Sequence, residues 1–273
     1  MPNTLTGAQA AAAIYAQVRL TEPPCLAAVS VGAQPDDRAY LHSITQAAAG
    51  CGVTVRPVPL PADCAPETLT DTLRALSADG AVHGVLLLRP LPAALRAQEI
   101  LDTLDARKDV DGMTTASLGA LVTGATGFAP CTAEACMELL RAHGIDPAGR
   151  RVTVVGRSLV IGRPAALLLT RADATVTLCH RKTPDLAARC RDADILLAAA
   201  GAPGLITRDF VRPGQIVLDA GATALPDGTL RGDVAPAAAA IAVCTPVPGG
   251  IGSVTTALLL RHTVQAAENL RHF

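Results

Sequence analysis

The chain has 273 residues, half of them apolar, and a formal net charge of −1 at pH 7. This length is sufficient for two domains of ordinary size, each with its own buried core. A nearly neutral chain lacks the clustered lysines and arginines that bind nucleic acid or anionic membranes, so we expect a small-molecule partner instead. Its apolar stretches fall short of the roughly 18 residues that span a bilayer.

The eight cysteines have no paired spacing, and no apolar run with a basic flank opens the chain. We therefore expect reduced cysteines in a cytoplasmic protein. Cys131 and Cys136 lack nearby histidine or cysteine at metal-ligand spacing, so we expect no metal site. Cys179 and Cys190, like these two, have no paired base and are interpreted as packing residues rather than reactive thiols.

Short β-rich apolar runs alternate with alanine- and leucine-rich stretches along the whole chain. This alternation predicts an α/β fold in which helices cover a mainly parallel sheet. In the first half, we expect helices over residues 7–19, 36–49 and 66–77 and strands over residues 25–31, 53–58 and 82–88.

A helix over residues 133–143 leads into Gly144-Ile-Asp-Pro147, whose glycine and proline end the helix. We place the domain junction on this helix, with one domain formed by residues 1–132 and 253–273 and the other by residues 133–252. In the second domain, we expect strands over 151–155, 174–178, 194–199 and 215–219 and helices over 164–170 and 184–191, with a last helix over 253–270. That order is typical of a Rossmann-like nucleotide-binding fold.

The first strand of the second domain ends in Gly156-Arg-Ser-Leu-Val-Ile-Gly162-Arg-Pro164. Such a turn directs free backbone N–H groups and the helix dipole at a pyrophosphate. Because the spacing is not the usual Gly-x-Gly-x-x-Gly, the turn alone is equally compatible with an ordinary strand-to-helix connection.

The next strand favours NADP over NAD as the cofactor. It runs into Cys179-His-Arg-Lys-Thr183, which has no carboxylate to accept from a ribose 2′-hydroxyl. Arg157 and Arg181 are suited to bracket a 2′-phosphate. The alternative is that Arg157, Arg181 and Lys182 form a solvated basic rim.

Four longer motifs resemble, in order and separation, those of the methylenetetrahydrofolate dehydrogenase/cyclohydrolase family: Lys108-Asp-Val-Asp-Gly112, Val155-Gly-Arg-Ser-Leu-Val-Ile-Gly-Arg-Pro164, Cys179-His-Arg-Lys-Thr183 and Thr245-Pro-Val-Pro-Gly-Gly-Ile-Gly252. Shorter matches are Val31-Gly32 with Pro35 and Tyr40, Pro90-Leu-Pro92, Pro130-Cys-Thr132, Ala200-Gly-Ala-Pro203 and Gly232-Asp-Val234. The likeness spans nearly the whole chain, which is therefore identified as a member of this family.

The resemblance implies a homodimer whose two-domain subunits hold a folate in the cleft between the domains and NADP on the second domain. It implies catalytic roles for Tyr40 and Asp111. Substrate contacts are implied for Tyr40, Ile44, Leu88, Asp111, Pro248, Gly249, Gly250 and Ser253. Cofactor contacts are implied for Gly156, Arg157, Ser158, Ile161, Gly162, His180, Arg181, Ala200, Gly201 and Pro203.

The chain departs from the family pattern at two polar positions. The family motif Tyr-x-x-x-Lys reads Tyr40-Leu-His-Ser-Ile44 here, and the glutamine of Gly-x-x-x-Gln-x-Pro-x-Pro is Leu88. An orphaned buried polar group costs about 1 to 3 kcal/mol, so a paired replacement by aliphatic residues is what packing requires. The two lysines of the chain, Lys108 and Lys182, belong to other motifs. Further departures are Arg89, Ala133 and Ser253.

These departures affect the two reactions of the family differently. Hydride transfer from a methylene group between two nitrogens needs placement more than proton transfer. Hydrolysis of the methenyl product needs a base and an acid, and a tyrosine with its ordinary pKa near 10 is a weak base at neutral pH. His42 is two helix positions from Tyr40 and points about 200° around the axis, so it is a poor replacement. We expect dehydrogenase activity without efficient cyclohydrolase activity.

The matching aspartate of the family holds the amino-pyrimidine part of the pterin, so Asp111 implies a substrate with a pterin or another amidine-like ring. The alternative is a loop aspartate in an Asp-Gly turn. For Gly249, Gly250 and Gly252, close approach to a ligand and a simple bend into the last helix both stay open. Two other functions also stay open: a paralogue acting on a non-folate cyclic imine or aminal, and a catalytically silent NADP-binding protein. Shikimate-type dehydrogenases share the two-domain plan but depend on a substrate lysine that is missing here.

Overall fold

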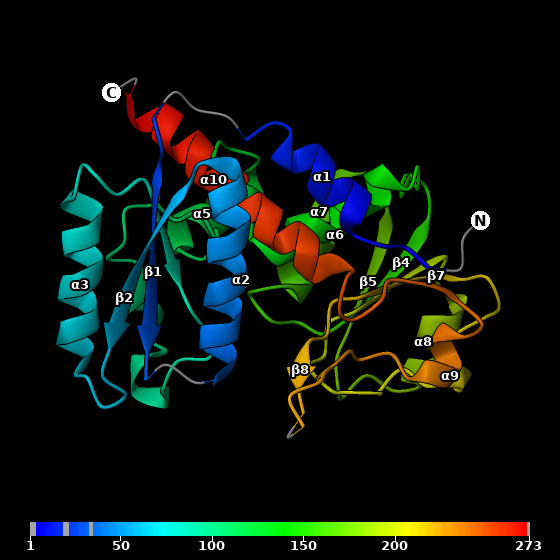
Figure 1. Cartoon of the computed structure of the whole chain (residues 1–273). Coiled ribbons are helices and arrows are strands. Elements are labelled where there is room, and N and C mark those ends of the chain that lie inside the picture. Colours follow the sequence, from blue (N-terminus) through cyan, green and yellow to red (C-terminus); the bar gives the residue numbers. More distant parts are fainter. Residues whose placement is uncertain (1–3, 19–21, 33–34, 226, 272–273) are drawn as a thin grey trace. The chain divides into compact units, whose positions relative to one another are not determined.

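Figure 1 shows a computed structural model of the chain, which describes residues 4–18, 22–32, 35–225 and 227–271. It divides into two compact units. Unit 1 comprises Met1–Ala12 and Thr132–Thr255, and unit 2 comprises Ala13–Cys131 and Thr256–Phe273. Each unit is built on a parallel sheet accompanied by helices, which confirms the predicted α/β fold class.

The sheet of unit 2 has the strand order β2-β1-β3, with all pairs parallel. Its strands are β1 (Cys25–Val31), β2 (Thr54–Leu60) and β3 (Gly84–Leu87), and its helices are α2 (Pro35–Cys51), α3 (Pro66–Ala78), α4 (Gln98–Leu101) and α5 (Thr115–Thr123), with a 3-10 turn at Ala93–Leu95. The central strand β1 is a buried apolar run. β2 lies at the edge, where Pro57 and Pro59, which have no N–H to donate, are tolerated.

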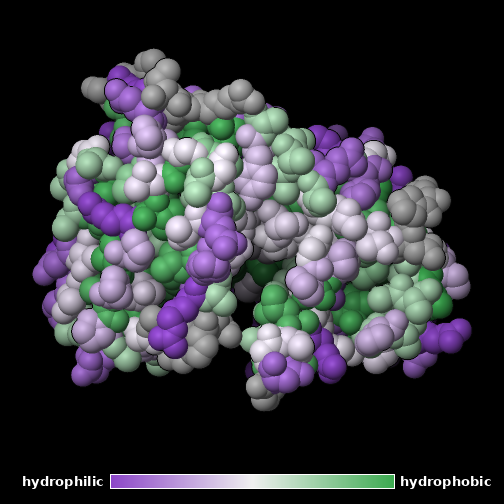
Figure 2. Space-filling model, in the orientation of Figure 1, coloured by the Kyte–Doolittle hydropathy of each residue, from purple (hydrophilic) through white to green (hydrophobic). Residues whose placement is uncertain are grey.

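Helix α2 carries the segment in which the sequence analysis placed Tyr40 and Ile44. Ile44 and Ala48, four residues apart and so on one helix face, are fully buried. Arg38, His42 and Gln46 follow the same spacing on another face and are exposed. Figure 2 shows the resulting strip of hydrophilic residues over α2.

The sheet of unit 1 has five strands in the order β10-β7-β6-β4-β5, again all parallel. The strands are β4 (Arg151–Val155), β5 (Thr175–Cys179), β6 (Ile195–Ala198), β7 (Ile216–Asp219) and β10 (Val243–Cys244), and β8 (Thr223–Ala224) pairs with β9 (Leu230–Arg231) apart from this sheet. The helices are α6 (Cys131–Ala142), α7 (Gly162–Arg171), α8 (Leu186–Asp192) and α9 (Pro236–Ala239), with a 3-10 turn at Arg208–Phe210. β6 is buried along its whole length and anchors the core of the unit.

The start of the chain differs from the sequence-based expectation, which assigned residues 1–132 to one domain. Met1–Ala12 groups with unit 1 instead. The Leu5 N–H donates to the carbonyl oxygen of Cys244, and the Gly7 N–H donates to that of Gly249, both at 2.9 Å. Because these contacts are made by the backbone, they leave no hydrophobic pattern in the sequence from which they could be predicted. The expected end of the first helix at Arg19 lies outside the described residues; the described helix α1 covers Ala8–Tyr15.

Helix α10 (Ile251–Arg271) begins in unit 1 and continues in unit 2 from Thr256. Its burial is extensive, with Val254, Leu258 and Thr263 at 0 % exposure. Within the described residues, no helix combines the length and the hydropathy that a membrane crossing requires.

Candidate active site

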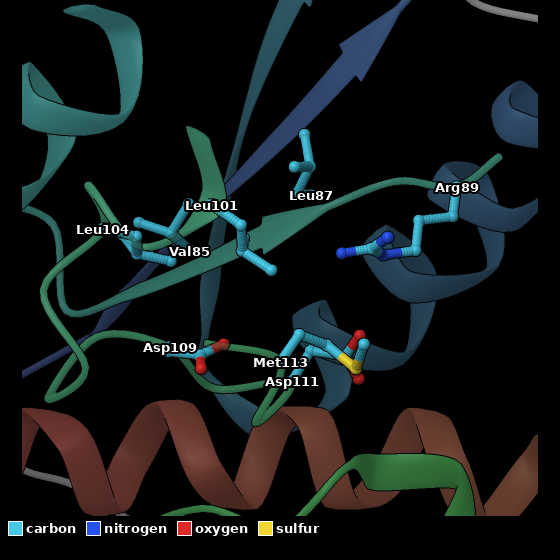
Figure 3. A pocket seen from close by; sticks show the side chains of 8 residues that line it. All are labelled: Val85, Leu87, Arg89, Leu101, Leu104, Asp109, Asp111 and Met113. Carbon is cyan, nitrogen blue, oxygen red and sulfur yellow. The ribbon is translucent and has the colours of Figure 1, made fainter. Parts of the chain in front are cut away.

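A small pocket lies beside β3 in unit 2, with about 220 Å³ of empty space that includes open solvent. It is lined by Val85, Leu87, Arg89, Leu101, Leu104, Asp109, Asp111 and Met113. Figure 3 shows the Arg89 side chain extending over the pocket on the side where Asp111 and Met113 lie. An apolar pocket with a few convergent charged groups is the usual form of a small-molecule site.

The loop that carries the two carboxylates is fixed against β3 by its backbone. The Val85 N–H donates to the carbonyl oxygen of Lys108 at 2.8 Å, and Asp109 forms an isolated parallel bridge with Val85. Gly112 follows with φ of +65°, and a Cβ there would lie 2.5 Å from the carbonyl oxygen of Phe128. Only glycine fits this turn without displacing the backbone.

Asp109 is a structural carboxylate, which the sequence analysis did not single out. It is 2 % exposed, and its Oδ2 accepts hydrogen bonds from the Thr114 N–H and the Ser117 hydroxyl, both at 2.7 Å. Its Oδ2 is therefore engaged at the start of helix α5. The sequence signal for Asp109 was its position two residues before Asp111 in the Lys-Asp-Val-Asp motif. Both carboxylates line the same pocket.

Asp111 is half-buried in this pocket. Burial raises the pKa of Asp111 to about 6, and the negative charge of Asp109 acts in the same direction. The positive charge of Arg89, a hydrogen bond from Cys131 and the proximity of His262 act against this rise. The carboxyl group therefore changes charge close to physiological pH, and its neighbours decide how much of it is ionised.

Tyr40 lies close to Asp111 and interacts with the side chain of Thr256. Burial raises the pKa of Tyr40 above its usual value, and Asp111 and Cys131 add to that rise. The hydrogen bond with Thr256 acts in the opposite direction, but the net effect is a raised pKa of Tyr40. Tyr40 is therefore a poorer base at neutral pH than an exposed tyrosine.

The two aliphatic replacements are both buried. Ile44 is 0 % exposed and Leu88 is 5 % exposed. His42 is exposed, and its Nε2 lies 2.9 Å from the side-chain amide of Gln46, so it is engaged away from the core. Lys108 cannot replace the missing lysine either, because its Nζ donates to the carbonyl oxygens of Leu76 at 3.2 Å and Asp79 at 2.8 Å, at the end of α3.

A buried polar cluster that the sequence analysis missed lies behind Asp111. His262, 2 % exposed, has Nδ1 2.9 Å from the carbonyl oxygen of Val110 and 3.5 Å from the sulfur of Cys131. The Cys131 thiol donates to the same carbonyl oxygen at 3.2 Å, and the ring of Phe128 lies 4.8 Å from the His262 ring. A histidine in the middle of the predicted last helix was the available signal. Cys131 is accounted for here as a buried hydrogen-bond donor.

The predicted nucleotide-binding turn lies at the point in the sheet of unit 1 where the order of successive strands reverses. β5 lies on one side of β4 and β6 on the other, which makes the carboxyl ends of β4 and β6 the topological switch point. Gly156 follows β4 at this point, with φ of +128°. The Ser158 hydroxyl accepts from the Ile161 N–H at 3.1 Å, and α7 then begins at Gly162.

The second loop at the switch point, residues 200–202, is held by a buried carboxylate. Asp233 is 0 % exposed and accepts from the N–H groups of Ala200 at 2.6 Å, Gly201 at 3.0 Å and Ala202 at 2.7 Å. Its own N–H donates to the Asp219 carboxylate at 2.9 Å. Asp233 of the Gly-Asp-Val motif thus fixes the backbone of a predicted cofactor loop. The motif match alone did not reveal this role.

Three of the residues predicted to bind the cofactor have accessible side chains. Arg157, Ser158 and Arg181 are exposed. The His180 N–H donates to the Thr183 hydroxyl at 2.9 Å, which closes the turn that carries Arg181 after β5. Cofactor contacts for these residues and for Pro203 stay predictions.

The predicted substrate residues of the motif over 245–252, and Ser253 after it, belong to unit 1. Pro248 and Gly249 are exposed, whereas Gly250 is buried, and a Cβ on it would lie 2.5 Å from the carbonyl oxygen of Pro246. The Ser253 hydroxyl donates to the carbonyl oxygen of Gly250 at 2.7 Å, in the first turn of α10. Packing alone accounts for Gly250, while ligand approach at Gly249 stays a prediction.

Gly162→Ala is expected to destabilise the protein by about 1 to 3 kcal/mol and to weaken binding of NADP. A Cβ at Gly162 would lie 2.0 Å from the carbonyl oxygen of Gly156, so the turn has to change shape. Thermal unfolding and NADP titration measure the two effects. The control is Gly119→Ala, on an exposed part of α5 with nothing within 4 Å, which is expected to leave stability unchanged or raise it by about 0.5 to 1 kcal/mol. An unchanged unfolding temperature for Gly162→Ala would contradict the packing argument.

Comparison with known proteins agrees with the site motifs. Residues 5–111 match the catalytic domain, and residues 130–271 the NAD(P)-binding domain, of tetrahydrofolate dehydrogenase/cyclohydrolase. A bifunctional protein FolD of Chloroflexus aurantiacus is 46% identical over 260 residues, covering 94% of this chain and 91% of the relative. The bifunctional FolD enzyme of Campylobacter jejuni has a similar structure, with a TM-score of 0.92, 36% identity and coverage of 98% and 99%. The Trypanosoma brucei FolD structure, complexed with NADP and an inhibitor, has a TM-score of 0.90, 33% identity and coverage of 98% and 96%. The resemblance stated from the motifs is confirmed, and the chain belongs to the tetrahydrofolate dehydrogenase/cyclohydrolase family.

Proposed function

We propose that this protein is a methylenetetrahydrofolate dehydrogenase that has lost cyclohydrolase activity. Its family shows that it is an NADP-dependent oxidoreductase of the methylenetetrahydrofolate dehydrogenase type. The proposed loss of cyclohydrolase activity is carried by one observation. The site retains a carboxylate, Asp111, while the position of the expected lysine is the fully buried Ile44.

The residues of the chain account for binding and placement of the reactants. Ionised Asp111 accepts hydrogen bonds from adjacent N–H groups of a pterin ring, and Leu87 and Met113 belong to the apolar part of the pocket lining. The backbone at Gly156 and the loop that Asp233 holds fit a pyrophosphate at the switch point. When bound there, NADP supplies the nicotinamide ring that accepts hydride. No step of this transfer requires a protein base.

Three candidate proton carriers, Tyr40, Lys108 and His42, are each unsuited to hydrolysis of the methenyl product. Tyr40 holds its proton more tightly than an exposed tyrosine, because burial raises its pKa. Lys108 is bound to the end of α3, and His42 is exposed and engaged with Gln46. Proton transfer by a positioned group contributes about 10²- to 10⁴-fold to such reactions, which is the acceleration we expect to be missing.

The test is the absorbance of purified protein with methylene-tetrahydrofolate and NADP, followed at the NADPH and methenyl-folate bands. We expect both species to grow equally, with the methenyl species decaying at its uncatalysed rate. Rapid decay of the methenyl species would contradict the loss of cyclohydrolase activity. Absence of NADPH in protein that binds NADP would contradict the folate assignment and favour a non-folate cyclic imine or aminal; absence of turnover with all of these would favour a silent NADP-binding protein.

We also propose that the protein is a homodimer, as the family resemblance implies, and that it is cytoplasmic. The unpaired spacing of the eight cysteines supports an intracellular location. Sedimentation equilibrium of the purified chain tests the dimer. A sedimenting mass equal to that of one 27.8 kDa chain at micromolar concentration would contradict it.

Arg181→Ala is expected to raise the Kd for NADP by about tenfold and to leave the Kd for NAD unchanged, because one charge-assisted contact to the 2′-phosphate is lost. Cofactor titration without substrate measures both constants. Lys182→Ala is the matched control, since the neighbouring side chain is also exposed. Equal losses for the two variants would instead favour a solvated basic rim that attracts NADP without specific contact.

A further inference from the structure

Arg89 introduces a guanidinium into the pocket at a position where the chain departs from its family. Arg89 comes two residues after the end of β3, and its side chain lines the pocket together with Asp109 and Asp111. Figure 3 shows it reaching over the pocket toward the side occupied by Asp111 and Met113, with Asp109 and aliphatic side chains in the rest of the lining. Among the eight lining residues, Arg89 is the one cation.

Titratable or charged groups from five segments, its own loop included, lie near Asp111. Asp109 on its own loop contributes a second negative charge, while Arg89 at the end of β3 contributes a positive one. Cys131 at the start of α6 hydrogen-bonds with it, His262 on α10 acts on its charge, and Tyr40 on α2 lies close to it. Burial and Asp109 favour the protonated carboxyl group, so the charged form depends on the other neighbours.

We propose that Arg89 is a positioning residue that holds Asp111 in its charged form, ready to accept hydrogen bonds from the ring N–H groups of the substrate. An arginine suits this role because its side chain stays charged throughout the physiological range. It cannot accept a proton, so it does not replace the missing lysine in hydrolysis. The inference rests on the proposed function insofar as Asp111 binds the substrate.

The role has a direct consequence for the pH dependence of substrate binding. A protonated Asp111 offers one acceptor fewer and an O–H that faces the N–H donors of the substrate. Activity therefore falls as the pH falls through the pKa of Asp111, which burial raises to about 6. Removing Arg89 raises the pKa of Asp111, so the fall in activity begins at a higher pH. The loss of activity is therefore large at acidic pH and absent at alkaline pH.

The first measurement titrates Asp111 itself, in protein carrying carbon-13 at the aspartate carboxyl groups. Asp111→Asn removes one resonance and so assigns it. We expect Arg89→Met to raise the apparent pKa of Asp111 by about one unit, Arg89→Lys to keep it near that of the natural protein, and Arg74→Met to leave it unchanged. Arg74 is the matched control because it is an exposed arginine of unit 2, on α3, paired with Asp71 and outside the pocket lining.

The second measurement is the pH profile of kcat/KM with methylene-tetrahydrofolate. For a one-unit rise, Arg89→Met is expected to lose about five-fold at pH 6 and about two-fold at pH 7, with no loss at pH 8.5. A uniform loss at every pH, or an Asp111 resonance that titrates as in the natural protein, would overturn the proposal. If the resonance shifts as expected while no variant turns over the folate, the role of Arg89 stands and the proposed function fails.

Discussion

Asp111→Asn is expected to lower kcat/KM for methylene-tetrahydrofolate by about 100-fold near pH 8, with little change in NADP affinity. Asparagine presents an NH₂ group where one carboxylate oxygen accepts, so a paired, charge-assisted contact to the substrate ring becomes a single neutral one. Losses of about 1.5 to 3 kcal/mol per contact to a charged group give this magnitude. Steady-state kinetics with both substrates measures it, and a separate cofactor titration shows whether the effect is confined to the folate.

The stability of the same variant gives the internal control. The pKa of Asp111 is raised to about 6 in the folded protein, so its charged form is disfavoured there relative to the unfolded chain. This costs at most about 3 kcal/mol above pH 6, and the cost is removed as the pH falls from 6 toward 4. Asp111→Asn is therefore expected to leave stability unchanged or raise it at neutral pH.

Asp109→Asn is the matched contrast on the same loop. Thr114 and Ser117 both donate to Oδ2, a place that the amide oxygen can take. The amide then puts a buried NH₂ donor in place of Oδ1, which is expected to cost about 1 to 3 kcal/mol. A large loss of stability in Asp111→Asn would mean that Asp111 holds the loop, as an ordinary turn aspartate does. Full activity in a stable Asp111→Asn protein would remove Asp111 from the substrate site altogether.

The elements that the sequence predicted best are those whose pattern is local. β1 and β4 agree with their expected ranges, 25–31 and 151–155, because each is a buried apolar run bounded by turn residues. Helix α5 (Thr115–Thr123) was missed, because its buried residues, Ser117 and Leu121, form no clear apolar stripe. The placement of residues 1–12 with unit 1 depends on backbone hydrogen bonds to β10 and Gly249, which no side-chain pattern records.

The site divides in a similar way. Motif matches led to Asp111, Gly156 and Gly162, because close backbone approach and planar recognition restrict the residue type at single positions. The surroundings of Asp111 come from segments far apart in the sequence, such as Cys131 on α6 and His262 on α10. Their combined effect on one carboxyl group is a property of the tertiary structure, and no single segment contains it.

Ile44→Lys/Leu88→Gln is expected to gain cyclohydrolase activity, raising methenyl-tetrahydrofolate hydrolysis by about 100-fold over the natural protein. The lysine is reintroduced one helical turn after Tyr40, and the amide oxygen of the glutamine supplies the acceptor that the family motif pairs with it. Decay of the methenyl band without NADP measures the gain. The gain should grow as the pH rises, since only the neutral lysine accepts a proton from water.

The single variants separate chemistry from packing. Ile44 is 0 % exposed, so Ile44→Lys alone buries an ammonium group and is expected to lose about 3 to 5 kcal/mol at neutral pH. Burial lowers the pKa of a lysine relative to the unfolded chain, so part of this loss is recovered as the pH rises through that lowered pKa. Ile44→Leu keeps the volume, and we expect it to cost less than about 1.5 kcal/mol and to hydrolyse nothing.

The double variant is therefore expected to be more stable than Ile44→Lys although it carries one more change in the core, because Leu88→Gln gives the buried ammonium group an acceptor. Additive losses of stability would contradict the pairing of the two positions. A folded double variant with no gain in hydrolysis would mean that another residue of the site also opposes it. Tyr40 is the first candidate, because burial keeps its proton bound where a base is needed.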